Sequence, residues 1–199
     1  MKTTRLLIAS LALAAMAGGI LTACQDAHAK TQADSQPESM SQEQLVKRGA
    51  YLVSAIGCDD CHSPKVFGPN GPEPDMERRF SGYQEGRPLP EANKDALKDW
   101  VLFAPDLTAA VGPWGTSFAA NITSDGTGIG NWTEEQFFRA IREGKSKGLA
   151  NSRSLLPPMP WPVYRNMSDD DLRAIFAYLK STKPVHNIVP QPVPPGGVQ

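Results

Sequence analysis

Five consecutive residues carry the most specific chemistry in this sequence. Cys58 and Cys61 are separated by two residues, and His62 follows directly, which gives the pattern C-x-x-C-H. Two thiols at this spacing can form thioethers with the two vinyl groups of haem, while the adjacent imidazole reaches the iron. The pattern therefore predicts one covalent haem c, attached through Cys58 and Cys61, with His62 as an axial ligand of the iron.

A zinc site and a thioredoxin-like redox pair are the alternatives to haem attachment. Zinc takes about four nitrogen or sulfur ligands, and outside the motif the chain offers only Cys24, His28 and His186. A thioredoxin-like pair belongs in a βαβ context, whereas this motif follows an amphipathic helical pattern. The sequence favours haem over both.

The second axial position decides whether such an iron carries electrons or binds ligands. Met40 and Met167 each precede a helix cap and are interpreted as hydrophobic staples, while Met76 lies among charged residues. Met159 lies in an apolar loop with proline on both sides, which fixes the backbone and can hold the soft thioether rigidly. We expect Met159 to be the ligand; Met76, His186 and an open site are the alternatives.

The N-terminus has the pattern of an export signal. Lys2 and Arg5 precede an uncharged apolar stretch at 6–20, and Leu-Thr-Ala-Cys follows at 21–24. The last four residues look like a bacterial lipobox, which predicts a signal peptide at 1–23 and a lipid on Cys24. Cleavage after Ala29, giving a soluble periplasmic protein, and an uncleaved anchor are the alternatives.

Composition limits the remaining possibilities. Lys and Arg number 20 against 21 Asp and Glu, so the chain lacks the basic footprint of a nucleic-acid binder. Glycine and proline make up 35 of the 199 residues, which predicts a loop-rich fold. We expect a flexible tether at 24–40, a domain at 41–188, and an extended, proline-rich tail at 189–199.

Helix punctuation predicts the elements that position the motif. Ser41 with Gln44 opens a helix that runs to Gly57, and Thr133 with Gln136 opens another that ends near Gly144. Ser168 opens a third, which ends after Lys180. The segment from 91 to 103 has helical spacing, but a short hairpin reaching Thr123 fits the region equally well.

These features together resemble a class I cytochrome c. The resemblance rests on Arg48-Gly49-Ala50-Tyr51 before the motif, on the late methionine loop, and on the terminal helix at 171–179. It covers about 41–65 and 131–185, and it implies a mainly α fold with a loop-rich insert at 64–130, for which a short β-hairpin is one option. It also implies that the first and last helices cross at Gly49, against aromatic residues such as Tyr178.

Two segments, 131–133 and 159–167, more specifically resemble cytochrome modules that accept electrons from periplasmic dehydrogenases. The resemblance implies a periplasmic electron carrier that is not itself an enzyme. Its redox partners would be a dehydrogenase, an oxidase or another cytochrome. A haem subunit docked in a dehydrogenase complex and a ligand-binding sensor with an open sixth site are the alternatives. Such subunits often carry two or three haem motifs, whereas this chain has one.

Weaker candidates lie in the expected haem environment. Trp132, Trp161 and Asn121 could donate hydrogen bonds to the haem propionates, and Arg78 or Arg79 could neutralise one of them. Core packing of the tryptophans and a solvated face for the arginines are equally compatible with the sequence.

Overall fold

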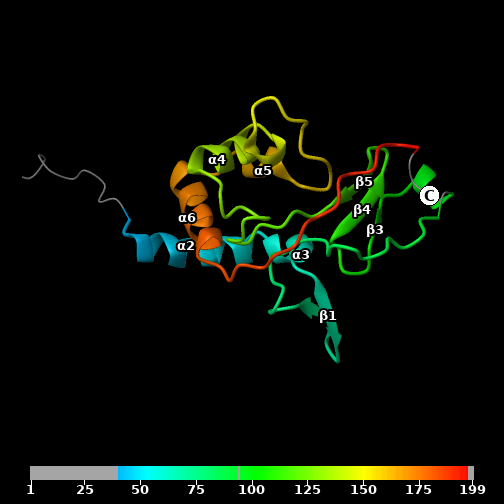
Figure 1. Ribbon diagram of the computed structural model, residues 1–199, viewed down its shortest axis with the longest axis horizontal. Coiled ribbons are helices and arrows are strands. Elements are labelled where there is room, and N and C mark those ends of the chain that lie inside the picture. Colours follow the sequence, from blue (N-terminus) through cyan, green and yellow to red (C-terminus); the bar gives the residue numbers. More distant parts are fainter. Residues whose placement is uncertain (1–39, 94, 197–199) are drawn as a thin grey trace, which may run out of the picture. The chain divides into compact units, whose positions relative to one another are not determined.

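The computed structural model describes residues 40–93 and 95–196 (Figure 1). The predicted signal peptide at 1–23, the predicted lipidation site Cys24 and the predicted tether up to residue 39 lie outside the described residues. Within the part that is described, no helix is both long and apolar enough to cross a membrane.

Two capped helices form the frame of the domain. Helix α2 (Gln42–Ala55) begins at Ser41, whose hydroxyl accepts a hydrogen bond from Gln44 N, while Gln44 Oε1 accepts one from Ser41 N. Helix α6 (Asp169–Lys180) begins at Ser168, which accepts from Asp171 N. Both helices begin where the capping pattern predicts.

Helices α2 and α6 pack directly against each other at Gly49. A Cβ atom at Gly49 would lie 1.9 Å from Ala174 O and 2.6 Å from Tyr178 Cβ, so the two backbones approach as closely as glycine allows. An ion pair between Arg48 and Asp171 (2.9 Å) bridges the same interface. The predicted crossing of Gly49 against Tyr178 is confirmed.

The hydrophobic core lies between these helices, α4 (Glu134–Arg142) and the loops that join them. Thr133 and Gln136 form the predicted capping box of α4, and Gly144, with φ +65°, follows its C-cap. Phe137 of α4 packs on Phe176 of α6, with ring centroids 5.2 Å apart. The buried members of the core are Leu52, Val53, Phe80, Ile129, Phe137, Leu172, Ala174, Ile175 and Leu179.

The insert contains more β structure than we expected. Strands β1 (Lys65–Gly68) and β2 (Gly71–Pro74) form one antiparallel hairpin, with Lys65 opposite Pro74. Strands β3 (Leu102–Phe103), β4 (Ala109–Gly112) and β5 (Gly115–Phe118) form a second antiparallel sheet in the order β3-β4-β5. The insert therefore contains two small antiparallel sheets, where we had considered one short hairpin.

The helical spacing at 91–103 yields only the 3-10 turn η1 (Ala96–Lys98). Trp100 and Val101, which supplied part of that spacing, are exposed, so they have no core face to pack against. The hairpin alternative for the region up to Thr123 is the correct one. The tight turn between β4 and β5 ends at Gly115, with φ +92°, where a Cβ would lie 2.0 Å from Val193 O.

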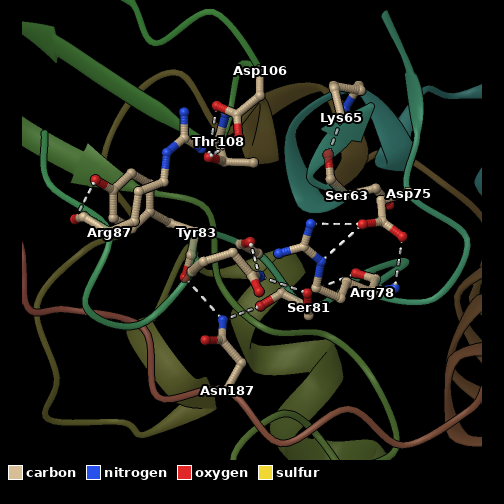
Figure 2. A network of polar contacts seen from close by, with 12 residues as sticks. Ser63, Lys65, Asp75, Arg78, Ser81, Tyr83, Arg87, Asp106, Thr108 and Asn187 are labelled. Atoms are coloured by element: carbon tan, nitrogen blue, oxygen red, sulfur yellow. Dashed lines mark hydrogen bonds and ion pairs between the residues drawn. The ribbon is translucent and has the colours of Figure 1, made fainter. Parts of the chain in front are cut away.

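Polar side chains hold the insert to the rest of the domain (Figure 2). Buried Asn187 donates through Nδ2 to Ser81 O (2.7 Å) and Tyr83 O (2.9 Å). Asp106, also buried, pairs with Arg87 and accepts from Thr108 Oγ1 (3.0 Å). Buried charges and amides are stable only when partnered in this way, so the network fixes the path of the insert.

The C-terminal segment runs beside the second sheet (Figure 1). Val193 N donates to Thr116 O (3.0 Å), and Thr116 N donates to Val193 O (2.8 Å). Two backbone hydrogen bonds thus join the proline-rich segment to β5.

Candidate functional site

The C-x-x-C-H motif forms one short helix, α3 (Cys58–His62), immediately after α2. Gly57 precedes it with φ +74°, in the left-handed region where a side chain would also meet Asp60 Oδ2 at 2.7 Å. Within α3, positions three residues apart share one face of the helix, so Cys58 and Cys61 lie side by side. Both are half-buried free thiols.

Contacts from Lys65 and Arg79 hold helix α3 in place, and Arg79 also links it to α6. Lys65 Nζ donates to the carbonyl oxygens of Asp59 (2.9 Å), Asp60 (3.0 Å) and Ser63 (2.6 Å), which caps the C-terminus of α3. Asp59 pairs with Arg79 at 2.6 Å, and Arg79 donates in turn to the hydroxyl of Tyr178. Although burial by itself raises the pKa of Asp59, hydrogen bonds from Arg79 and Ser63 bring it below its ordinary value. The motif is therefore fixed in place by charge-assisted contacts.

The imidazole of His62 is oriented by a backbone carbonyl. His62 Nδ1 donates to Ala120 O at 2.7 Å, just beyond β5, and His62 O accepts from Gly82 N at 2.8 Å. Because Nδ1 carries the proton, Nε2 is the nitrogen with a free lone pair. Burial lowers the pKa of His62, so the ring is neutral near pH 7 and can bind a metal ion.

The two thiols are protonated at neutral pH. Burial, followed by the negative charge of Asp59, raises the pKa of Cys58 to about 12. Burial also raises the pKa of Cys61, with Asp60 adding to the effect. Such surroundings suit neutral sulfur, as in a thiol or a thioether, better than the thiolates of a zinc site.

The loop that carries Met159 leads directly into a helix that contacts the segment before the motif. Met159 is half-buried, and its N–H donates to Leu156 O (3.3 Å), which closes a tight turn. Helix α5 (Trp161–Tyr164) follows, and the hydroxyl of Tyr164 donates to Ile56 O (2.8 Å), two residues before Cys58. The structure thus fastens α5, which follows the methionine loop, to the segment that opens the motif.

Sequence reasoning assigned no role to Tyr164. Burial raises its pKa, and the nearby Cys58 and Cys61 add to that rise, so the phenol lies beside the motif. Its position five residues after Met159 was visible in the sequence, but its partner Ile56 is 108 residues away. No local pattern reveals such a contact.

The two alternative protein ligands of the iron are exposed. Met76 is 65% exposed. The side chain of His186 is 70% exposed and lies 3.6 Å from Asp125. Nothing in the described structure joins either residue to α3.

The three weaker candidates differ in their surroundings. The amide of Asn121 is fully used inside the protein: Nδ2 donates to Thr127 Oγ1 and Val185 O, and Oδ1 accepts from Thr123. Trp132 and Trp161 are half-buried. A propionate role for the two tryptophans stays a prediction, whereas the amide of Asn121 is already engaged by the protein. The remaining candidates are also engaged, Arg79 with Asp59 and Arg78 with Asp75.

The donor set fits haem c. Among residues 40–93 and 95–196, no group of three His, Cys, Asp or Glu side chains is arranged to hold a metal ion. Instead, one helical turn presents two neutral thiols and a neutral imidazole whose Nδ1 is engaged by Ala120 O, and Cys58 packs against the hydrophobic core. Thioether attachment and axial ligation need groups of this kind.

Comparison with known proteins agrees with a donor set for haem c. No family model matches the chain. It is 32% identical over 154 residues to the gluconate 2-dehydrogenase cytochrome c subunit of Pantoea cypripedii, which covers 77% of this chain and 25% of the relative. It is also 32% identical, over 145 residues, to the cytochrome c subunit of the quinone-type alcohol dehydrogenase of Gluconobacter oxydans, with 72% and 23% covered.

A third relative is the fructose dehydrogenase cytochrome subunit of Gluconobacter japonicus, 31% identical over 142 residues, with 70% of this chain and 22% of the relative covered. This chain spans about a quarter of the length of these cytochrome subunits. Over about three quarters of its own length, the chain is thus similar to cytochrome modules of dehydrogenases, which confirms the resemblance predicted from its sequence.

Proposed function

We propose that this chain is an electron-transfer module with a class I cytochrome c fold and one haem c. Cys58 and Cys61 attach the haem, and His62 and Met159 are its axial ligands. The observation that carries the proposal is the geometry of α3, where both thiols share a face and the Ala120 carbonyl leaves His62 Nε2 available.

When bound, haem c supplies a one-electron iron couple. His62 gives the iron a strong nitrogen ligand, which the Ala120 carbonyl keeps in one orientation. Met159 contributes a thioether, a soft ligand that favours reduced iron and raises the reduction potential. The indole N–H groups of Trp132 and Trp161 would suit propionate oxygens. The chain itself makes and breaks no substrate bond.

The redox partners are inferred from the relatives of this chain. Those relatives are cytochrome subunits of gluconate and alcohol dehydrogenases, so we infer that a periplasmic dehydrogenase donates the electrons and that the respiratory chain accepts them. The same names support a subunit docked in a dehydrogenase complex as well as a free carrier. Co-purification of the chain with a dehydrogenase from solubilised membranes separates these two forms of the proposal.

Covalent attachment tests the proposal directly. The chain produced in a host that matures c-type cytochromes should keep haem peroxidase staining on a denaturing gel, with a mass increase of one haem. The double variant Cys58→Ala/Cys61→Ala should lose both, while Cys24→Ser, which removes the third cysteine, should keep both. Extraction of all haem into acid acetone from the wild type would contradict the proposal.

Lipidation of Cys24 would hold the module at the periplasmic side of the membrane. Because the sequence at 25–38 is polar, only acyl chains on Cys24 would give this end of the protein membrane affinity. We expect the mature protein to partition with detergent and Cys24→Ser to stay unprocessed or become soluble. A mature N-terminus at Lys30 would instead indicate a soluble periplasmic protein.

A further inference from the structure

The methionine loop has few groups with which to hold itself in place. In the run from Pro157 to Pro160, only Met159 has a backbone N–H, because proline has none. That N–H is used inside the turn, on Leu156 O. The loop can therefore be tied to the rest of the protein only through its carbonyl oxygens or by side-chain packing.

Ser117 of β5 makes such a tie. Its Oγ donates to Pro157 O at 2.6 Å, across 40 residues of sequence. Among the described residues, this is the one hydrogen bond that joins positions 156–159 to another part of the chain. Ser117 is 7% exposed, so little water competes for the bond.

The hydroxyl of Ser117 is itself oriented. Trp114 Nε1 donates to Ser117 Oγ at 3.2 Å, which occupies a lone pair and leaves the single hydroxyl proton for Pro157. A second possible acceptor, Ala110 O, is much farther, at 3.4 Å. The shorter bond to Pro157 is therefore the dominant one.

The segment directly after β5 contacts the other predicted axial ligand. Three residues after Ser117, Ala120 O accepts the hydrogen bond from His62 Nδ1 (2.7 Å). The backbone between them is fixed, since Ala119 N donates to Thr108 O (2.8 Å) and Ala119 O accepts from Tyr83 N (3.0 Å). One short segment of the insert thus contacts both the ring of His62 and the turn that carries Met159.

We propose that Ser117 is a positioning residue that keeps the Met159 loop closed over the iron, and that the insert is present in this module partly to supply it. This inference rests on the proposed ligation by Met159. Loss of the Ser117 bond should raise the fraction of chains in which the loop is open and the sixth position is free.

The fraction of open loops can be measured with free imidazole on the full-length ferric holoprotein. Imidazole binds only when Met159 has left, so its apparent Kd varies inversely with the open fraction. We expect Ser117→Ala to lower this Kd by roughly fivefold and to weaken the near-infrared sulfur-to-iron band at lower imidazole concentration. Ser124→Ala is the matched control, because Ser124 Oγ also donates to a carbonyl at 2.6 Å, that of Thr182.

Two further variants separate positioning from general stability. Ser117→Thr keeps the hydroxyl and should behave as the wild type. Trp114→Phe keeps an aromatic ring at this position but removes the N–H that donates to Ser117. It should also lower the imidazole Kd, by less than Ser117→Ala does. If Ser117→Ala does not accumulate as holoprotein, the imidazole Kd of Trp114→Phe tests the role of Ser117 instead.

An unchanged imidazole Kd in Ser117→Ala, or an equal fall in Ser124→Ala, would overturn the role of Ser117 while leaving Met159 as the ligand. In the case where Trp114→Phe decides, a Kd equal to that of the wild type would overturn it. A wild type without the near-infrared band would contradict ligation by Met159 itself, and the role of Ser117 with it.

Discussion

The helical frame and the insert hold the same site by different means. At the crossing of α2 and α6, backbone meets backbone at Gly49, among apolar side chains and the Arg48–Asp171 ion pair. The insert has two small sheets and an apolar cluster of its own, and it contains buried polar contacts such as the Arg87–Asp106 pair and the hydrogen bonds from Asn187. The frame therefore depends mainly on close backbone packing, whereas the insert combines apolar contacts with individual polar partners.

This difference suggests a division of labour. The frame brings α2 and the terminal helix together, and Arg79 of the insert joins α3 to the terminal helix through Asp59 and Tyr178. The insert also contacts the two predicted axial ligands or their loop, through Ala120 and Ser117. Damage to the frame should cost the domain more stability than damage to the insert, and damage at Ala120 or Ser117 should also alter the iron site.

The largest effect is expected from Gly49→Ala. Its Cβ would overlap Ala174 O at 1.9 Å, so α2 and α6 must separate. We expect a loss of about 3 kcal/mol in the free energy of unfolding, measured by urea denaturation of the holoprotein. The control is Gly68→Ala in β1, where the added Cβ meets only Gly71 O at 4.0 Å. Equal loss in the two variants would contradict a close-packed crossing.

A smaller effect is expected from Arg87→Met in the insert. It leaves the buried carboxylate of Asp106 with Thr108 as its remaining side-chain partner. We expect a loss of about 2 kcal/mol, again from urea denaturation. Arg78→Met is the control, since its pair with Asp75 is half exposed on the arginine side and should cost under about 1 kcal/mol. A larger loss for Arg78→Met would reverse the ranking.

The smallest effect concerns Asp125, at the end of the insert. Hydrogen bonds from the Thr127 hydroxyl and N–H hold its pKa below the ordinary 3.8. A lowered carboxyl pKa stabilises the folded state above pH 3.8, and this contribution disappears as the pH falls through the folded value. Thr127→Val should move the carboxyl pKa upward in an NMR titration and leave the carboxyl ionised at neutral pH. A pKa that does not move would assign the shift to other groups.

The frame could be predicted from the sequence because its signals are local. Ser41 with Gln44 and Thr133 with Gln136 lie within one turn of the helices they open, and apolar spacing marks the buried faces. The C-x-x-C-H pattern is also local, and α3 keeps its five residues on one helical segment. Gly49 needed the family resemblance, since a glycine inside a helical pattern has no local meaning of its own.

The insert could not be predicted in the same way. Its strands are two to four residues long, too short for a reliable alternation of apolar and polar positions. Its stabilising contacts join residues far apart in sequence, such as Asn187 with Ser81 and Ser117 with Pro157. Asn121 shows the consequence: its position suggested a propionate donor, but its amide is taken up by Thr127 and Val185.

The central claim is that His62 and Met159 together occupy both axial positions of one haem c. The most direct measurement is the near-infrared spectrum of the ferric wild type together with carbon monoxide binding to the ferrous form. We predict a sulfur-to-iron charge-transfer band and slow or absent binding near neutral pH, with Met159→Ala losing the band, binding carbon monoxide quickly and having a lower reduction potential. Met76→Ala and His186→Ala should match the wild type. Rapid stoichiometric carbon monoxide binding by a wild type that lacks the band would contradict the account and favour a ligand-binding or sensing haem protein.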